Sequence, residues 1–152
     1  MPKDEKMEEQ SHKEPEAETV PIFSKEVVRD IVLPDLLGKD HSEILYWAGK
    51  QLARKFPLND LQETIEFFMN AGWGTLEEQK SSKHEAEYIL HGNLIKRRFD
   101  LNKDCEFQLE AGFLAQQIEL QKKCIAETAT EQKRRSNQVK FLVRWDSKDR
   151  IE

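Results

Sequence analysis

Apolar residues at helical spacing mark three segments in the N-terminal half of the chain. The first helix is expected over residues 24–37, interrupted by Pro34, because valines and an isoleucine recur at three- and four-residue intervals after a favoured N-cap serine. The second is expected over residues 40–56, where Pro57 stops it, and the third over residues 59–72, where glycine ends it. The N-terminal half is therefore predicted to be helical.

Further along the chain, apolar and polar residues alternate, which is typical of β-strands. Residues 75–80 and 85–91 predict one hairpin, and residues 124–130 and 139–145 predict a second one with a polar tip. Residues 94–101 fit either a third strand or a short irregular crossover, and the pattern leaves both open.

Between the hairpins, residues 106–122 predict a strong helix whose apolar face is wide enough for a central position. Gly112 lies inside it, although glycine destabilises a helix interior by about 1 kcal/mol relative to alanine. A close approach by another helix or a sheet would be a reason for this glycine. The element order, helices, hairpin, helix and hairpin, predicts an α+β fold and disfavours a doubly wound nucleotide-binding fold.

Charge divides the 152-residue chain unevenly. Residues 1–20 hold three lysines and seven acidic residues, a net charge of −4, and the whole chain carries −5, which leaves −1 for residues 21–152. The acidic segment has no aromatic residue and is expected to be disordered, either as an interaction tail or as a solubilising leader. Residues 21–152 are then expected to form a single domain, large enough to fold without disulfides.

The composition argues against several classes of partner. A nearly neutral body lacks the basic excess of a nucleic-acid-binding surface, so no nucleic-acid partner is expected. No stretch approaches 18 apolar residues, so no membrane span is expected. Two cysteines and the lack of an apolar secretory segment at the N-terminus indicate a reducing compartment, and the expected localisation is cytoplasmic.

The sequence carries no signature of a catalytic site: no phosphate-binding glycine loop, no nucleophile elbow and no zinc-protease motif. His84 and His91 stand seven residues apart on one predicted strand and point to opposite faces, so no metal site is expected. Cys105 precedes a helix and Cys124 lies on a strand. Each is interpreted as a small structural residue, with a cysteine nucleophile as the alternative. We therefore expect neither an enzyme nor a cofactor.

Three segments resemble those of a known family, namely EILYWAGKQLARKF (43–56), FFMNAGWGTL (67–76) and FQLEAGFLAQQIE (107–119). They are similar to the bacterial YslB family of short uncharacterised proteins, over nearly all of residues 21–146. That family is in turn similar to a superfamily of vinyl-four-reductase domains, haem–nitric-oxide-binding domains and TRAPP subunits. The resemblance implies a TRAPP-like and haem–nitric-oxide-binding-like ligand-binding fold, often dimeric through helix packing. In it, a twisted antiparallel sheet from the two hairpins packs against the N-terminal helices and the central helix.

Some members of this superfamily hold a small molecule, a haem or an acyl chain in an apolar interior. Vinyl-four-reductase domains often have two glycines four residues apart on the central helix. In this chain, Gln116 stands where the second glycine would follow Gly112. Those domains also often end with a cysteine pair, of which Cys124 matches the first and Val139 replaces the second. The missing second cysteine argues against a cysteine metal site, and no histidine lies in a predicted apolar helix where it could bind a haem.

These observations predict a non-enzymatic regulatory domain that binds a small apolar ligand, forms a homodimer, or does both. A pure protein–protein assembly module is the alternative, and a cysteine-dependent enzyme is the second alternative. If residues 94–101 form a strand, its arginine would share an apolar face and need a carboxylate partner or an anionic ligand. The candidate pocket consists of that arginine and six aromatic residues: Trp47, Phe68, Trp73, Arg97, Phe107, Phe113 and Phe141. The candidate dimer face consists of apolar residues of the second and third helices: Leu45, Leu52, Phe56, Leu61 and Ile65.

Overall fold

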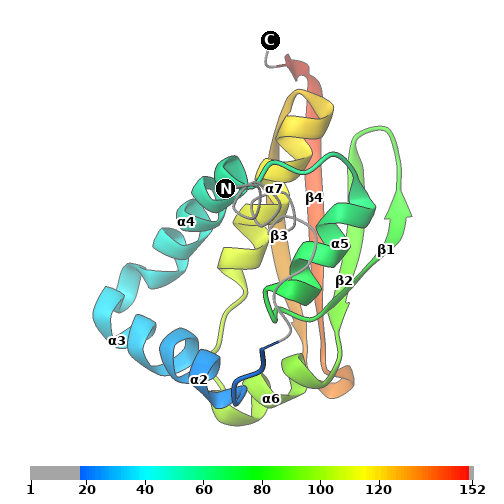
Figure 1. Ribbon diagram of the computed structural model, residues 1–152. Helices are drawn as coiled ribbons and strands as arrows, with labels where there is room; N and C mark the ends of the chain where they lie inside the picture. Colours follow the sequence, from blue (N-terminus) through cyan, green and yellow to red (C-terminus); the bar gives the residue numbers. More distant parts are fainter. Residues whose placement is uncertain (1–17, 151–152) are drawn as a thin grey trace, which may run out of the picture.

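A helical arm opens the fold (Figure 1). The computed structural model describes residues 18–150, with side chains for residues 18–146. The arm runs through four short elements, α2 (Phe23–Glu26), the π-helix η1 (Val27–Val32), α3 (Leu33–Leu37) and the 3-10 turn η2 (Gly38–Asp40). It confirms the first predicted helix. Most of the predicted acidic tail, residues 1–17, lies outside the described residues.

Pro34 does not break the arm, because it lies in the first turn of α3, where proline is tolerated. Without an N–H, Pro34 cannot donate to the carbonyl of Asp30, four residues earlier. The side-chain amide of Asn102 donates to that carbonyl instead, at 3.0 Å. The helix also widens into its π turn just before the proline. The expected interruption is therefore a change of helix type.

Two further helices confirm the second and third predictions, α4 (His41–Lys55) and α5 (Leu61–Asn70). Asp60 caps α5, since its side chain accepts a hydrogen bond from the N–H of Glu63 at 2.9 Å. Gly72, with a φ of +73°, turns the chain out of α5 toward the sheet.

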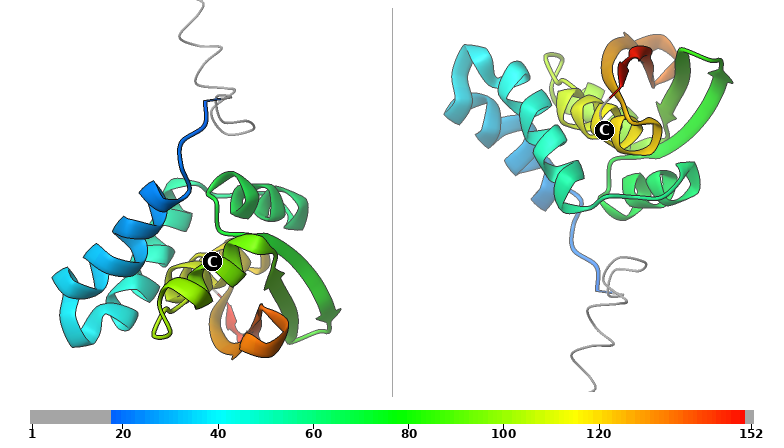
Figure 2. Two further views of the ribbon diagram at one scale, coloured as in Figure 1. Left: turned by 90° about the horizontal axis from the view of Figure 1, so that it is seen from below. Right: turned by 90° about the horizontal axis from the view of Figure 1, so that it is seen from above.

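The sheet has four antiparallel strands, β1 (Thr75–Ser81), β2 (Glu85–His91), β3 (Cys124–Lys133) and β4 (Gln138–Arg150). Their order is β1-β2-β4-β3, so the two predicted hairpins join along β2 and β4. In Figures 1 and 2 the twisted sheet lies on one side of the molecule and the arm with α4 on the other, with α7 between them. This is the α+β architecture that the sequence predicts.

α7 (Gln108–Lys122) is the central helix, as predicted, and ten consecutive residues, 110–119, are buried. α4 crosses it with the two backbones in contact. A Cβ atom on Gly49 would lie 2.1 Å from the carbonyl oxygen of Leu109, and a Cβ atom on Gly112 would lie 1.9 Å from that of Tyr46. The close approach predicted at Gly112 is confirmed.

Residues 94–101 are neither a strand nor an irregular crossover, the two forms that the sequence left open. They belong to the helix α6 (Asn93–Leu101). Its buried residues Ile95, Arg98 and Phe99 have the three- and four-residue spacing of one helix face. Ile95 and Phe99 are four residues apart, a spacing that fits a strand face as well as a helix face. The sequence pattern therefore did not distinguish a helix from a strand in this segment.

Candidate functional site

The arm is docked with its charged side inward. Glu26, Arg29 and Asp30, spaced as one helix face, are only 2%, 5% and 4% exposed. On the opposite side, Val28 and Ile31 are 51% and 42% exposed. A surface helix normally buries its apolar stripe, so this arm has the reverse orientation.

Arg29 holds the arm to the start of α7. It donates through Nη1 to Oε2 of Glu110 at 3.0 Å and through Nη2 to Oε1 at 2.6 Å, a bidentate pair. Its Nη2 also lies 3.5 Å from Oε1 of Glu106. Burial favours the neutral form of Glu110, but the charges of Arg29 and Arg98 outweigh burial and hold the pKa of this carboxyl below its ordinary 4.5.

Arg98 is the second buried arginine, and it comes from α6. Its Nε and Nη2 donate to the carboxylate of Asp30 at distances of 2.7–3.1 Å. Nη2 also donates to the backbone carbonyl of Glu106 at 2.7 Å, and the guanidinium lies 4.3 Å from the ring centroid of Phe107. One side chain, only 2% exposed, therefore joins the arm, α6 and the start of α7.

These contacts form a buried ion cluster, defined as Arg29, Asp30, Arg98, Glu106 and Glu110. Two cations share it with three carboxylates. Buried ion pairs contribute little net stability relative to apolar packing, but removing one member leaves an uncompensated charge. We infer that the ion cluster determines which side of the arm faces inward.

Arg97, the predicted site arginine, lies at the edge of the ion cluster. Its Nε and Nη2 donate to the two carboxylate oxygens of Glu26 at 2.9 and 2.7 Å. The carboxylate partner is therefore present, although Arg97 lies on a helix and its side chain is 40% exposed. The deeply buried arginine is its neighbour, Arg98.

Sequence reasoning missed the ion cluster. The available signal was a charged stripe, Glu26, Arg29 and Asp30, at helical spacing beside the apolar one. Its partner Arg98 lies 68 residues beyond Asp30, and its partner Glu110 lies 81 residues beyond Arg29. No local spacing connects them, so the sequence alone could not pair them.

The other side of the arm, together with the first half of α4, is the outer face of the molecule. Seven of the twelve exposed large apolar side chains of the described residues come from the arm and the first half of α4, so they are concentrated in one part of the chain. Leu36 and Trp47 are the most exposed of the seven, at 74% and 61%. Figure 2 shows these helices on the side of the molecule away from the sheet. The outer face consists of Phe23, Val28, Ile31, Val32, Leu36, Ile44 and Trp47.

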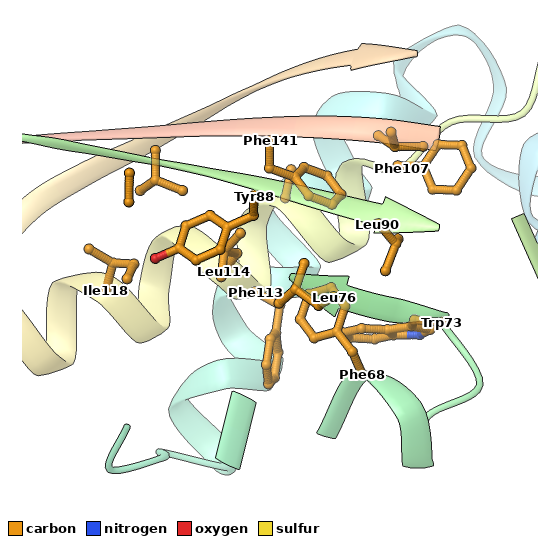
Figure 3. Close-up of a cluster of buried hydrophobic side chains, with 14 of the residues drawn as sticks. Phe68, Trp73, Leu76, Tyr88, Leu90, Phe107, Phe113, Leu114, Ile118 and Phe141 are labelled. Carbon is orange, nitrogen blue, oxygen red and sulfur yellow. The ribbon is translucent and has the colours of Figure 1, made fainter. Parts of the chain in front are cut away.

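Five of the seven predicted pocket residues are buried in the core, and Figure 3 shows them at the sheet and α7. The rings of Trp73 and Phe113 have centroids 5.2 Å apart, and Phe67 stacks on Phe113 at 4.4 Å. These rings pack against one another. Trp47 is separate from them, on the outer face. The five buried residues are Phe68, Trp73, Phe107, Phe113 and Phe141.

The predicted dimer-face residues turn toward the core. Leu45 is buried, and Leu52, Leu61 and Ile65 are partly buried against the core residues. Phe56 lies beside another phenylalanine, with ring centroids 5.5 Å apart. The apolar residues that α4 exposes belong to the outer face instead.

The surface of the described residues has two hollows that are not lined by the predicted pocket residues. One, of about 450 Å³, is lined by residues 80–82 and 85–87 of the first hairpin. The other, of about 200 Å³, lies between the end of α5 and the start of α6 and includes His91. A carboxylate oxygen of Glu77 lies 2.6 Å from Nε2 of this histidine. None of the predicted pocket residues lines either hollow.

Comparison with known proteins gives this chain a family. A family model described as a protein of unknown function (DUF2507) matches residues 22–144. The chain belongs to the DUF2507 family. The uncharacterized protein YslB of Bacillus subtilis (strain 168) is 48% identical over 129 residues, which cover 85% of this chain and 87% of YslB. The predicted resemblance to YslB is confirmed.

Solved structures share the fold of this DUF2507 protein. A vinyl-4-reductase family protein from Methanocaldococcus jannaschii has a TM-score of 0.63 at 14% identity, covering 87% of this chain and 85% of its own. A mutant Fe(II) unliganded H-NOX protein from K. algicida has a TM-score of 0.51 at 13% identity, covering 90% of this chain and 83% of its own. At these identities the likeness concerns the fold alone, and it confirms the predicted fold class.

The described part of the DUF2507 chain contains no group of three or more histidine, cysteine, aspartate or glutamate side chains placed to hold a metal ion. Within the same residues, no helix is long and apolar enough to cross a membrane. Neither the family description nor that of YslB assigns an enzymatic activity.

Both cysteines of this DUF2507 protein, Cys105 and Cys124, are free and buried. Burial raises the pKa of the Cys105 thiol above its ordinary 9.0, the opposite of what a cysteine nucleophile requires. We expect iodoacetamide to label Cys105 about tenfold more slowly, or slower still, in the folded protein than in urea, because the thiolate is disfavoured and the sulfur covered. Mass spectrometry of a labelling time course measures both rates. Equal labelling rates in the folded protein and in urea would instead support the cysteine-dependent enzyme.

Proposed function

We propose that this DUF2507 protein is a non-enzymatic cytoplasmic association module that forms a homodimer through its outer face. The observation that carries the proposal is the reversed orientation of the arm. A helix with charged and apolar sides has been folded with the charged side in, although apolar burial is the main favourable term in folding. An occupant that covers the apolar side would supply the missing burial.

The outer face is presented in a fixed position. Arg29 and Arg98 tie the arm to α6 and α7 through several short hydrogen bonds, so the apolar side chains need little reorganisation before they associate. Association is stronger when less conformational freedom is lost on binding. A preformed helix surface therefore favours a stable contact.

The size of the outer face fits a second copy of the chain. The outer face offers seven large apolar side chains that are 39–74% exposed, a set that suits the apolar centre of a standard interface, in which each partner buries roughly 800 Å² with its polar rim included. Two-fold homodimers are the commonest soluble oligomers, and they use the same patch on both copies. One apolar patch is sufficient for such an interface.

The charges around the outer face disfavour a membrane surface as its occupant. Its exposed neighbours Asp35, Lys39, Asp40 and Glu43 comprise three acids and one base. Helices that bind anionic lipid carry lysine and arginine on their polar flanks. The packed rings around Phe113 favour association without a ligand over the small apolar ligand that the sequence suggests.

The substitution Leu36→Glu tests this proposal. Leu36 is 74% exposed, so glutamate is tolerated in the monomer, but in the dimer its charge would be buried. We expect dimerisation to weaken about 30-fold or more, the effect of losing an interface hot spot worth about 2 kcal/mol. Sedimentation velocity over a range of concentrations measures the monomer–dimer equilibrium.

The matched control is Ile125→Glu. Ile125 is 51% exposed on β3, outside the outer face, so this variant should dimerise like the unaltered protein. Equal dimerisation of both variants would refute the outer face as the interface. Co-sedimentation of the unaltered protein with anionic vesicles, lost in Leu36→Glu alone, would assign the outer face to a membrane instead.

A further inference from the structure

The arm is attached to the rest of the fold through charged side chains rather than through the hydrophobic core. Its fully buried residues are Glu26, Arg29 and Asp30, and α3 and η2 bury none. No residue of the arm belongs to the core cluster of the described residues or to the apolar side chains packed against it. Apolar burial is the main favourable term in folding, whereas buried ion pairs add little net stability. We therefore expect the arm to be held less firmly than α4 or α7.

The ion cluster can be divided between the arm and the body without leaving a lone buried charge. Arg98 donates to the carbonyl of Glu106 at 2.7 Å and lies 3.7 and 3.6 Å from the carboxylates of Glu106 and Glu110. These three residues belong to α6 and the start of α7, so they stay together when Arg29 and Asp30 leave with the arm. Docking also leaves the Nε of Arg29 and the Nη1 of Arg98 buried without a hydrogen-bond partner, a cost that water removes when the arm opens.

Gly38 joins the arm to α4 at a point where nothing packs on the backbone. It follows α3 with a φ of +72°, and a Cβ atom placed there would have no neighbour within 4 Å. Every described element outside the arm comes after it in the chain, so this one connection is all that has to bend. Hinges of this kind are a few residues at the end of an element that absorb a change in backbone angles.

We propose that the arm is a hinged element that swings away from α6 and α7 as a unit about Gly38, and that its docking controls formation of the homodimer. The second part rests on the proposed function. Five of the seven side chains of the outer face come from the arm, and the other two, Ile44 and Trp47, come from α4. An open arm separates the two groups, so only the docked arm presents the complete outer face. By linkage, dimerisation in turn favours the docked arm.

Native-state hydrogen exchange of the full chain, followed by NMR, tests the hinge. At a concentration where the chain is monomeric, the protected amides of residues 24–37 should share one free energy of opening. They should exchange about tenfold faster, or more, than the buried amides of residues 110–119. Exchange in the arm as slow as in α7 would mean that the arm opens only in global unfolding, and a rate that falls steadily from residue 24 to residue 37 would mean that it frays from its end. Either result would overturn the hinge.

Two variants of α6 test whether charged contacts hold the arm. Arg97→Gln removes the partner of Glu26 and leaves the ion cluster intact, so the arm should exchange several-fold faster. Lys96→Gln is the matched control, because Lys96 pairs with Asp100 of its own helix and both side chains are exposed. It should leave exchange in the arm unchanged. Equal exchange in the two variants would overturn docking through charged contacts.

A higher protein concentration tests the link to the dimer. Where sedimentation shows a dimer, the arm should exchange several-fold more slowly, and in Leu36→Glu at the same concentration it should stay fast. A dimer whose arm exchanges as fast as that of the monomer would overturn the link and leave the homodimer standing. If no dimer forms at any concentration, the homodimer and the link both fail, while the exchange of the monomer still decides the hinge.

Discussion

Replacing Arg98 with methionine is expected to lower the free energy of unfolding by about 3–5 kcal/mol. Methionine fills much of the arginine volume, so the loss is mainly electrostatic. Asp30 loses its bidentate partner while it remains 4% exposed, and the carbonyl of Glu106 loses a donor at 2.7 Å. Total stabilities of about 5–15 kcal/mol are usual, so this one change removes a large part of the margin. Urea unfolding followed by circular dichroism measures it.

The matched control for Arg98→Met is Lys96→Gln on the same helix. Lys96 pairs with Asp100 at 2.9 Å, but both side chains are more than half exposed, and exposed pairs of this kind contribute only about 0.3–0.5 kcal/mol. The arginine variant should therefore lose several times more stability than the lysine variant. Similar losses in the two variants would mean that the ion cluster does not hold the arm.

Gly112→Ala is expected to destabilise the protein by about 3 kcal/mol or more. Helix propensity alone predicts the opposite sign, a gain of about 1 kcal/mol. The new Cβ atom would lie 1.9 Å from the carbonyl oxygen of Tyr46 and 2.8 Å from its carbonyl carbon, and backbone cannot rotate away as a side chain can. α4 and α7 would have to separate along their length.

The Gly112→Ala prediction is tested by whether the free energy of unfolding falls or rises. Gly49→Ala tests the same helix crossing independently. That alanine would meet the carbonyl oxygen of Leu109 at 2.1 Å, so it should destabilise the same helix crossing from the other side. Thermal and urea unfolding of both variants measure the effect. If either alanine variant were more stable than the unaltered protein, the crossing would be looser than described.

The N-terminal helices, the central helix and both hairpins could be predicted because each depends on a local pattern. Alternation marks the strands, and proline or glycine marks the helix ends near Pro57 and Gly72. The close approach at Gly112 could also be predicted, since an interior glycine is unfavourable without such a reason. Residues 94–101 were misread because Ile95 and Phe99 fit both periods.

The candidate site could not be predicted to the same extent, because its geometry depends on distant partners. The helical spacing of Val28 and Ile31 predicts a helix surface that faces the core. Whether it faces in or out is decided by Arg98 and Glu110, which meet Asp30 and Arg29 only in the folded chain. Aromatic residues were predicted to line a pocket, whereas in the structure most of them pack in the core.

In the proposed homodimer, a second copy of the chain covers the exposed outer face. Native mass spectrometry of the purified full chain, together with sedimentation equilibrium at micromolar concentration, tests it most directly. If the outer face is the dimer interface, the spectrum contains a species of twice the chain mass of 17.9 kDa, with no added mass from a ligand. A bare monomer at every concentration up to the millimolar range would contradict it.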